Sequence, residues 1–154
     1  MTYRIEGLKR ADFEHYFAMD AAELARHNAR RVTATGPGFP CRISLEDAPA
    51  GETLILLNHT SHDVATPYRA SYAIYLREAA AEAPGFADAT PPVFEGRPIA
   101  LRAFDDHGML ANAALALPGQ ADEKIRALFA DPAIAYIHAH NAAHGCFSAR
   151  IDRA

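Results

Sequence analysis

The sequence predicts an α+β protein: a mainly antiparallel sheet of six to eight strands, with two or three helices packed on it, ending in a C-terminal β-hairpin. Three observations lead to this prediction. Short apolar or alternating runs, typical of strands, recur along the chain. The clearest helical signals lie in the segments 10–18, 21–28 and 121–130, whereas the Ala-rich run 109–117 is ambiguous between helix and strand and the segment after residue 78 suits at best a short helical turn. Two alternating runs near the C-terminus are separated by Asn-Ala-Ala-His-Gly, a connection that suits a hairpin.

The size and composition indicate a soluble globular protein. Its 154 residues suggest a single domain over 1–154, and 50% hydrophobic with 22% charged residues is ordinary for that class. The net charge of -4 and the lack of a basic stretch argue against nucleic-acid binding. The longest apolar run, Leu54 to Leu57, is too short to span a membrane, and the first residues show no apolar signal core. We therefore expect a cytoplasmic protein whose Cys41 and Cys146 are reduced and unpaired.

The elements follow from local patterns along the chain. Asp20 with Glu23 three residues later indicates a capping box, so a helix is expected from Ala21 to about Asn28. Pro132 is expected to end the helix at 121–130. We expect strands at 3–8, 30–35, 41–45, 53–57, 71–76, 98–104 and 109–117, a further helix at 10–18, a loop at 58–67, and an exposed loop after residue 78.

The C-terminal hairpin is expected to separate polar from apolar side chains. The expected register pairs His140 with Cys146, His138 with Ser148, and Tyr136 with Arg150. One face of the hairpin would then be apolar, and the other would carry every polar group. His138 and His140 have a spacing that suits a metal ion, with Cys146 or His144 as a further ligand. A polar sheet face or a metal-free pocket is the favoured interpretation.

Cys41 and Arg42 follow a stiff Gly-Pro-Gly-Phe-Pro entry at 36–40. A cysteine beside an arginine can be nucleophilic, because the positive charge favours the thiolate. Alternation along a strand would nevertheless put Cys41 with Ile43 and Leu45 on an apolar face, which favours a buried structural thiol. Arg42 would then lie on the same face of the strand as Ser44, and it is the residue of greater functional interest.

A third group of polar residues surrounds Pro67. His59 and His62 precede it at a spacing that suits a metal or a helical turn, and Pro67 fixes the backbone before Tyr68 and Arg69. A guanidinium fork with a nearby hydroxyl suits a carboxylate or phosphate. The alternative is that Tyr68 covers the edge of the core and that Arg69 makes a structural ion pair.

Several of these segments together resemble the DUF1203 family of uncharacterised bacterial proteins. The segments that carry the resemblance are Pro37-Gly-Phe-Pro-Cys-Arg-Ile-Ser-Leu45, Leu56-Leu-Asn, His62, Thr66-Pro-Tyr-Arg69, Arg102-Ala-Phe-Asp105, Ile137-His-Ala-His-Asn-Ala, Gly145-Cys-Phe and Arg150. The resemblance implies a stand-alone bacterial domain and brings neither an activity nor catalytic residues. His59 lies at a position expected to vary in the family, which weakens the case for it as a metal ligand.

The polar residues lead to one main functional hypothesis and two alternatives. The main hypothesis is a pocket for a small anionic ligand, in a binding protein or an enzyme whose reaction and cofactor are unknown. One alternative is a non-catalytic homo-oligomeric module whose polar hairpin face packs against a second subunit, as in a homodimer. The other is a His/Cys metal-binding protein, although no metal ligand is assigned. The expected pocket residues are Arg42, His62, Tyr68, Arg69, His138, His140 and Cys146.

Overall fold

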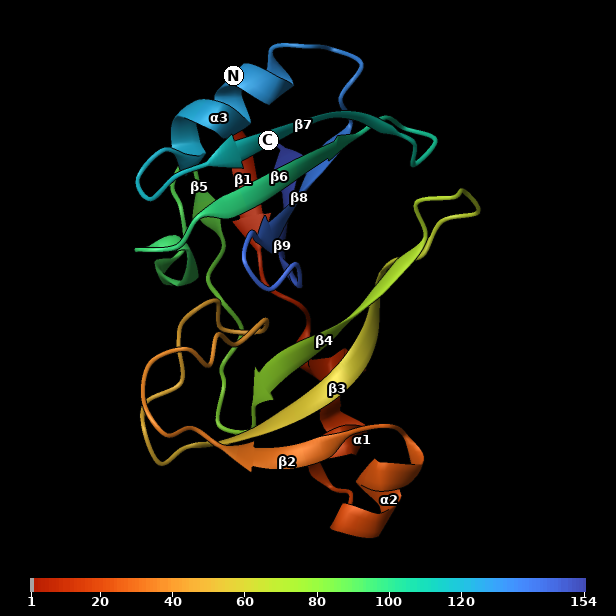
Figure 1. Cartoon of the computed structure of the whole chain (residues 1–154), viewed down its shortest axis with the longest axis vertical. Helices are drawn as coiled ribbons and strands as arrows, with labels where there is room; N and C mark the ends of the chain where they lie inside the picture. The colour runs from red at the N-terminus through yellow and green to blue at the C-terminus, as the bar shows by residue number, and fades with distance from the viewer. Residues whose placement is uncertain (1) are drawn as a thin grey trace.

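The strands form two antiparallel sheets, one above the other in Figure 1. The computed structural model describes residues 2–154. The larger sheet has six strands in the order β5-β1-β9-β8-β6-β7, and the smaller has three in the order β2-β3-β4. The predicted α+β class, the six-stranded antiparallel sheet and the C-terminal hairpin are confirmed. The sequence patterns did not predict that three of the strands would form a second sheet.

The larger sheet is covered on one side by α3. Its strands are β1 (Tyr3–Glu6), β5 (Phe86–Ala87), β6 (Ile99–Phe104), β7 (Leu110–Ala116), β8 (Tyr136–Asn141) and β9 (Phe147–Arg153), and the helix is α3 (Ala121–Phe129). The apolar faces of the hairpin and of α3 form one core, in which Ile125, Ile137 and Ile151 are fully buried. Helix α3 buries this face because its apolar residues recur at helical spacing.

The smaller sheet packs against the N-terminal helices. It consists of β2 (Arg30–Thr33), β3 (Thr53–His62) and β4 (Ala70–Arg77), beside the 3₁₀ helix η1 (Arg10–Asp12) and the helices α1 (Glu14–Phe17) and α2 (Ala21–Arg26). The predicted cap of α2 is present, since Asp20 Oδ1 accepts a hydrogen bond from the Glu23 backbone N–H at 2.8 Å. The N-terminal helices therefore cover the smaller sheet and not, as expected, the sheet that carries α3.

Two predicted local structures are wrong. Residues 41–45 form a turn and not a strand. All five side chains are buried, so the alternation of apolar residues does not separate a buried face from an exposed one. Strand β3 continues to His62 through the region expected to be a loop, because Asn58 to His62 pair with β4. The expected loop after residue 78 is interrupted only by β5 and by the 3₁₀ helix η2 (Pro92–Phe94).

The expected hairpin register is also wrong, although it assigns most side chains to the correct face. His138 pairs with Arg150 and not with Ser148, and Ala139 pairs with Ala149. A shift by two residues preserves the faces, because side chains alternate with a period of two. A bulge next to His140 then pairs that residue with Phe147, so the Phe147 ring lies among the histidines and not on the apolar face.

Candidate functional site

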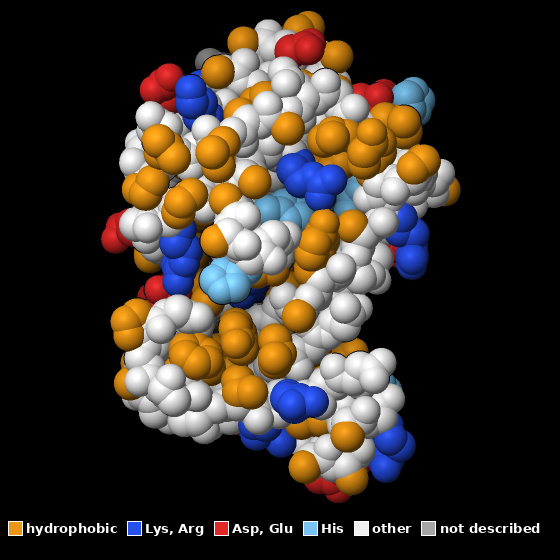
Figure 2. Space-filling view, in the orientation of Figure 1, with side chains coloured by type: hydrophobic (Ala, Val, Ile, Leu, Met, Phe, Trp, Pro, Cys, Tyr) orange, Lys and Arg blue, Asp and Glu red, His pale blue; other side chains and the backbone are white. Residues whose placement is uncertain are grey.

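The polar face of the hairpin is covered by the smaller sheet of the same chain. His62, at the end of β3, lies against His138 of β8 with 5.0 Å between ring centroids, and the rings of His138 and His140 are 6.5 Å apart. All three are buried. Figure 2 shows histidine side chains gathered at the middle of the molecule, where its upper and lower parts meet. Because this face is covered within the chain, it is not the surface for a second subunit that the oligomer hypothesis assumed.

Hydrogen bonds fix the rings of two of these histidines. His62 Nδ1 is 2.8 Å from the Tyr68 carbonyl oxygen, and its Nε2 is 2.6 Å from the Tyr136 hydroxyl. A carbonyl can only accept, so Nδ1 carries a proton and donates to Tyr68, while Nε2 is held by the Tyr136 hydroxyl. In the same way, His140 Nδ1 donates to the Gly145 carbonyl at 2.9 Å. These contacts order the rings before any ligand arrives.

His138 has no such anchor. Among residues 2–154, no side-chain or backbone group makes a hydrogen bond to its ring, which is only 2% exposed. Burial lowers the pKa of His138 to about 3, and electrostatic interactions with His62, Arg150, His140 and Arg102 act in the same direction. His138 is therefore a neutral ring at physiological pH.

Acidification is expected to destabilise the protein through His138. The unfolded chain takes up a proton at this residue near its ordinary pKa of about 6.5, whereas the folded protein does so only near pH 3. The contribution of His138 to the free energy of unfolding is fully present above about pH 6.5 and declines as the pH falls. At pH 5 the loss from this residue is about 2 kcal/mol. Urea denaturation at pH 7 and pH 5 measures this difference.

Two matched variants isolate the contribution of His138. His138→Gln should lose most of the acid-dependent decline, whatever its stability at pH 7. His107→Gln should keep the wild-type dependence, because the side chain of His107 is 83% exposed. Burial also lowers the pKa of His140, so some decline remains in both variants. An unchanged pH dependence in His138→Gln would contradict the assignment.

Tyr72 of β4 connects the histidines to a cavity between the sheets. Its ring is 4.9 Å from that of His140, and its hydroxyl accepts a hydrogen bond from Arg102 at 3.0 Å. Tyr72 also borders a cavity of about 420 Å³. The cavity is lined by Gly38, Pro40, Arg42, Leu56, Tyr72, Ala73, Tyr75, Arg97, Asn141, His144 and Cys146. No acidic residue of the described chain is among them.

Arg42 is the most deeply buried charged group that borders this cavity. Its side chain is 2% exposed, with Nε donating to the Phe147 carbonyl at 2.8 Å and NH1 to the Pro40 carbonyl at 2.6 Å. NH2 donates to Cys146 Sγ at 3.1 Å. Burial lowers the pKa of Arg42, since water no longer stabilises its charge. A guanidinium has more N–H donors than these three contacts use.

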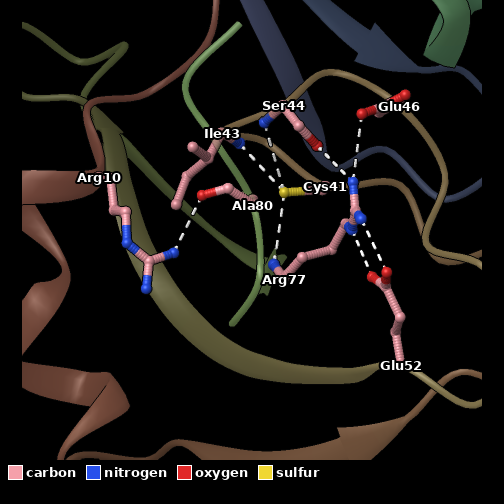
Figure 3. Close-up of polar contacts among 8 residues, drawn as sticks. All are labelled: Arg10, Cys41, Ile43, Ser44, Glu46, Glu52, Arg77 and Ala80. Atoms are coloured by element: carbon pink, nitrogen blue, oxygen red, sulfur yellow. Dashed lines mark hydrogen bonds and ion pairs between the residues drawn. The ribbon is translucent and has the colours of Figure 1, made fainter.

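The pairing of Arg42 differs from that of Arg77, which contacts the same turn through Cys41 and Ser44. Arg77 donates to both oxygens of Glu52, at 2.6 and 2.9 Å, and to Glu46 at 3.2 Å (Figure 3). Within residues 2–154, no carboxylate lies within 4 Å of the Arg42 guanidinium. Buried charges are normally paired, because an isolated charge loses its hydration without compensation. The unpaired charge on Arg42 is thus an unusual feature of this fold.

Cys41 forms the turn that holds Arg42 in place. Its Sγ accepts backbone N–H groups from Ile43, Ser44 and Arg77 at 3.3–3.5 Å, as Figure 3 shows. It is fully buried, which confirms the expected structural thiol. Both cysteines are free thiols, as predicted.

Tyr68 and Arg69 lie apart from the cavity. The Tyr68 ring packs against Phe104, with 6.3 Å between centroids. Arg69 is exposed and forms a 3.1 Å ion pair with Asp63, as the structural alternative assumed. Neither residue is among those that line the cavity. The expected pocket residues therefore form three groups: Arg42 and Cys146 line the cavity, the three histidines fill the junction beside it, and the Tyr68-Arg69 pair lies outside.

Sequence reasoning missed four polar residues of the cavity, one of which is Tyr75 of β4. Asn141 directly follows the His-x-His pattern, Tyr72 lies in a strand that was predicted, and Arg97 lies in an irregular segment with no local signal. Only the position of Asn141 beside the hairpin histidines could have suggested a role. No three His, Cys, Asp or Glu side chains in the described part of the chain are placed to hold a metal ion.

The edge strand β7 has an uncharged surface. Residues 109–117 carry no charge, and Met109, Leu115 and Leu117 are the exposed large hydrophobic side chains of the described chain. Unpaired edges of this kind can pair with another chain. The homodimer alternative stays a prediction. No helix in residues 2–154 has the length and apolar character needed to cross a membrane.

The fold and the site together define an α+β protein with an acid-free, arginine-bearing cavity between two antiparallel sheets. Residues 38–153 match the family model described as protein of unknown function (DUF1203), which spans most of the chain and confirms the resemblance. The chain belongs to this family. No curated protein and no solved structure matches it.

Proposed function

We propose that the protein binds a small anionic molecule, a carboxylate or a phosphate, in the cavity between its two sheets. The observation that carries this proposal is Arg42, a buried guanidinium that lines the cavity, has no carboxylate partner and makes fewer hydrogen bonds than it has N–H donors. A bound anion would supply the missing counter-charge and accept the remaining N–H groups in a bidentate contact. The hydroxyl of Tyr72 and the amide of Asn141 line the same cavity and would orient the ligand.

The histidines beside the cavity do not supply positive charge in this proposal. Burial lowers the pKa of His138 to about 3, so that ring stays neutral between pH 6 and 8, and burial also lowers the pKa of His140, which favours its neutral form. The stronger anion binding at pH 6 that unperturbed histidines would give is therefore not expected. Arg42 keeps its charge over this range, and the affinity for an anion whose own charge is constant should change little with pH.

Thermal-shift measurements with small carboxylates and inorganic phosphate test the proposal. At constant ionic strength, a true ligand should raise the melting temperature, because a ligand at about 100 times its Kd stabilises a protein by about 2.7 kcal/mol. Arg42→Lys should weaken this stabilisation at least tenfold in apparent Kd, since the planar fork is lost. Arg69→Lys is the matched control and should respond as wild type, because Arg69 is exposed and outside the cavity. A wild-type protein that no anion stabilises would refute the proposal.

A further inference from the structure

We propose that Cys146 is a reactive thiol that exchanges with a small carboxylate-bearing disulfide and retains one half of it as a mixed disulfide. This inference rests on the proposed anion site, because Arg42 would hold the carboxylate of the incoming disulfide. It assigns Cys146 a covalent role in addition to lining the cavity.

The surroundings of Cys146 are those of a reactive cysteine. Its Sγ lies 3.1 Å from NH2 of Arg42 and 3.6 Å from Nδ2 of Asn141, and both groups donate to it. The thiolate is the attacking species in disulfide exchange, and Arg42 is placed to stabilise its negative charge. Cys146 is also partly exposed at the cavity wall. Cys41 is fully buried and outside the cavity, so the two thiols of the chain should differ sharply in reactivity.

Asn141 gives independent evidence for a ligand and indicates its chemistry. The side chain lines the cavity and is 7% exposed, and its Oδ1 has no hydrogen-bond partner among the described residues. An unsatisfied buried acceptor is costly, and an N–H donor from a ligand would remove that cost. The cavity thus offers a guanidinium for a carboxylate, an amide oxygen for an N–H, and a thiol for a sulfur. A small peptide-like thiol, in its disulfide form, has all three groups.

The exchange step is balanced without any further oxidant. The Cys146 thiolate attacks one sulfur of the ligand, and a new S–S bond forms as the ligand's own S–S bond breaks. The electron pair leaves with the departing thiolate, which takes a proton from water. One disulfide is consumed and one is formed. Arg42 then loses its contact with a thiolate, and its charge is balanced by the carboxylate of the retained half.

Four small disulfides of related structure separate the features that the site should recognise. N,N′-diacetylcystine has a carboxylate and an amide N–H, dithiodiglycolate has only the carboxylate, N,N′-diacetylcystamine has only the N–H, and bis(2-hydroxyethyl) disulfide has neither. Mass spectrometry of the native protein at pH 7.5 gives the rate of each reaction and the modified residue. We expect modification at Cys146, with diacetylcystine at least tenfold faster than the hydroxyethyl compound. The net charge of -4 alone would produce the opposite order.

Two variants test whether Arg42 produces the preference for a carboxylate and Asn141 the preference for an N–H group. Arg42→Lys should reduce the advantage of the carboxylate compounds to about threefold or less, and Asn141→Leu should abolish the advantage of the N–H compounds. Arg69→Lys should leave all four rates unchanged. Equal rates for the four disulfides on wild-type protein, or no faster reaction at Cys146 than at Cys41, would overturn the inference. This comparison needs no variant, so it remains decisive if Arg42→Lys fails to fold.

A serine variant distinguishes failure of this inference from failure of the proposed anion site. Cys146→Ser keeps Arg42 and should still be stabilised by carboxylates. Anion stabilisation without selective disulfide exchange would leave the anion site intact and exclude the covalent role. Fast exchange at Cys146 with no charge preference and no anion stabilisation would refute both the proposed site and the ligand class assigned here.

Discussion

Replacing Ile125 with aspartate is expected to unfold the protein at neutral pH. Ile125 is fully buried between α3 and the larger sheet, in the core that contains Ile137 and Ile151. An aspartate there would place a carboxylate without a partner in an apolar environment, or force it to bind a proton. The expected cost is about 5 kcal/mol or more, which is comparable with the whole stability of a typical domain. Urea denaturation followed by circular dichroism measures it.

Lys124→Ala is the control for this substitution. Lys124 is the preceding residue of the same helix, but its side chain is 35% exposed and forms a 3.8 Å ion pair with Glu123. Surface changes of this kind usually alter the free energy of unfolding by less than about 0.5 kcal/mol. If the two variants unfolded at the same urea concentration, the orientation of α3 would be wrong.

Gly7→Ala is expected to destabilise the protein by about 3 kcal/mol and to weaken anion binding as well. A Cβ at this position would lie 2.0 Å from the Ile43 carbonyl oxygen and 2.9 Å from its carbon, and both are backbone atoms. The next residue, Leu8, donates its N–H to the Arg42 carbonyl at 2.8 Å. The chain after β1 thus packs directly on the turn that holds Arg42, so a shift there should displace the guanidinium.

Gly36→Ala provides the matched comparison. A Cβ at Gly36 would meet nothing within 4 Å, so the same substitution should change stability by less than about 0.5 kcal/mol. Chemical denaturation gives the stabilities, and the thermal-shift series with carboxylates gives the binding. If the Gly7→Ala protein were as stable as the Gly36→Ala protein, the chain after β1 would not be in such close contact with the turn at Ile43.

Local patterns predicted the elements whose formation depends on neighbouring residues. Asp20 caps α2 because its side chain reaches an N–H only three residues away. The stripe that contains Ile125 gave α3, since helical spacing brings such residues to one face. The hairpin followed from two alternating runs and a short connection. The same reasoning failed at residues 41–45, where all the side chains are buried and apolar alternation no longer distinguishes two faces.

The candidate site likewise has some features that depend on local sequence and others that depend on tertiary contacts. The sequence by itself determined that Arg42 follows a stiff entry, that His138 and His140 share a face, and that Cys146 lies near the hairpin turn. Only the tertiary structure decided that β3 and β4 cover this face, which brings His62 against His138, buries the rings and lowers the pKa of His138. It also left Arg42 without a carboxylate and placed Arg69 outside the cavity. Burial and charge pairing depend on contacts between distant segments, and no local spacing encodes them.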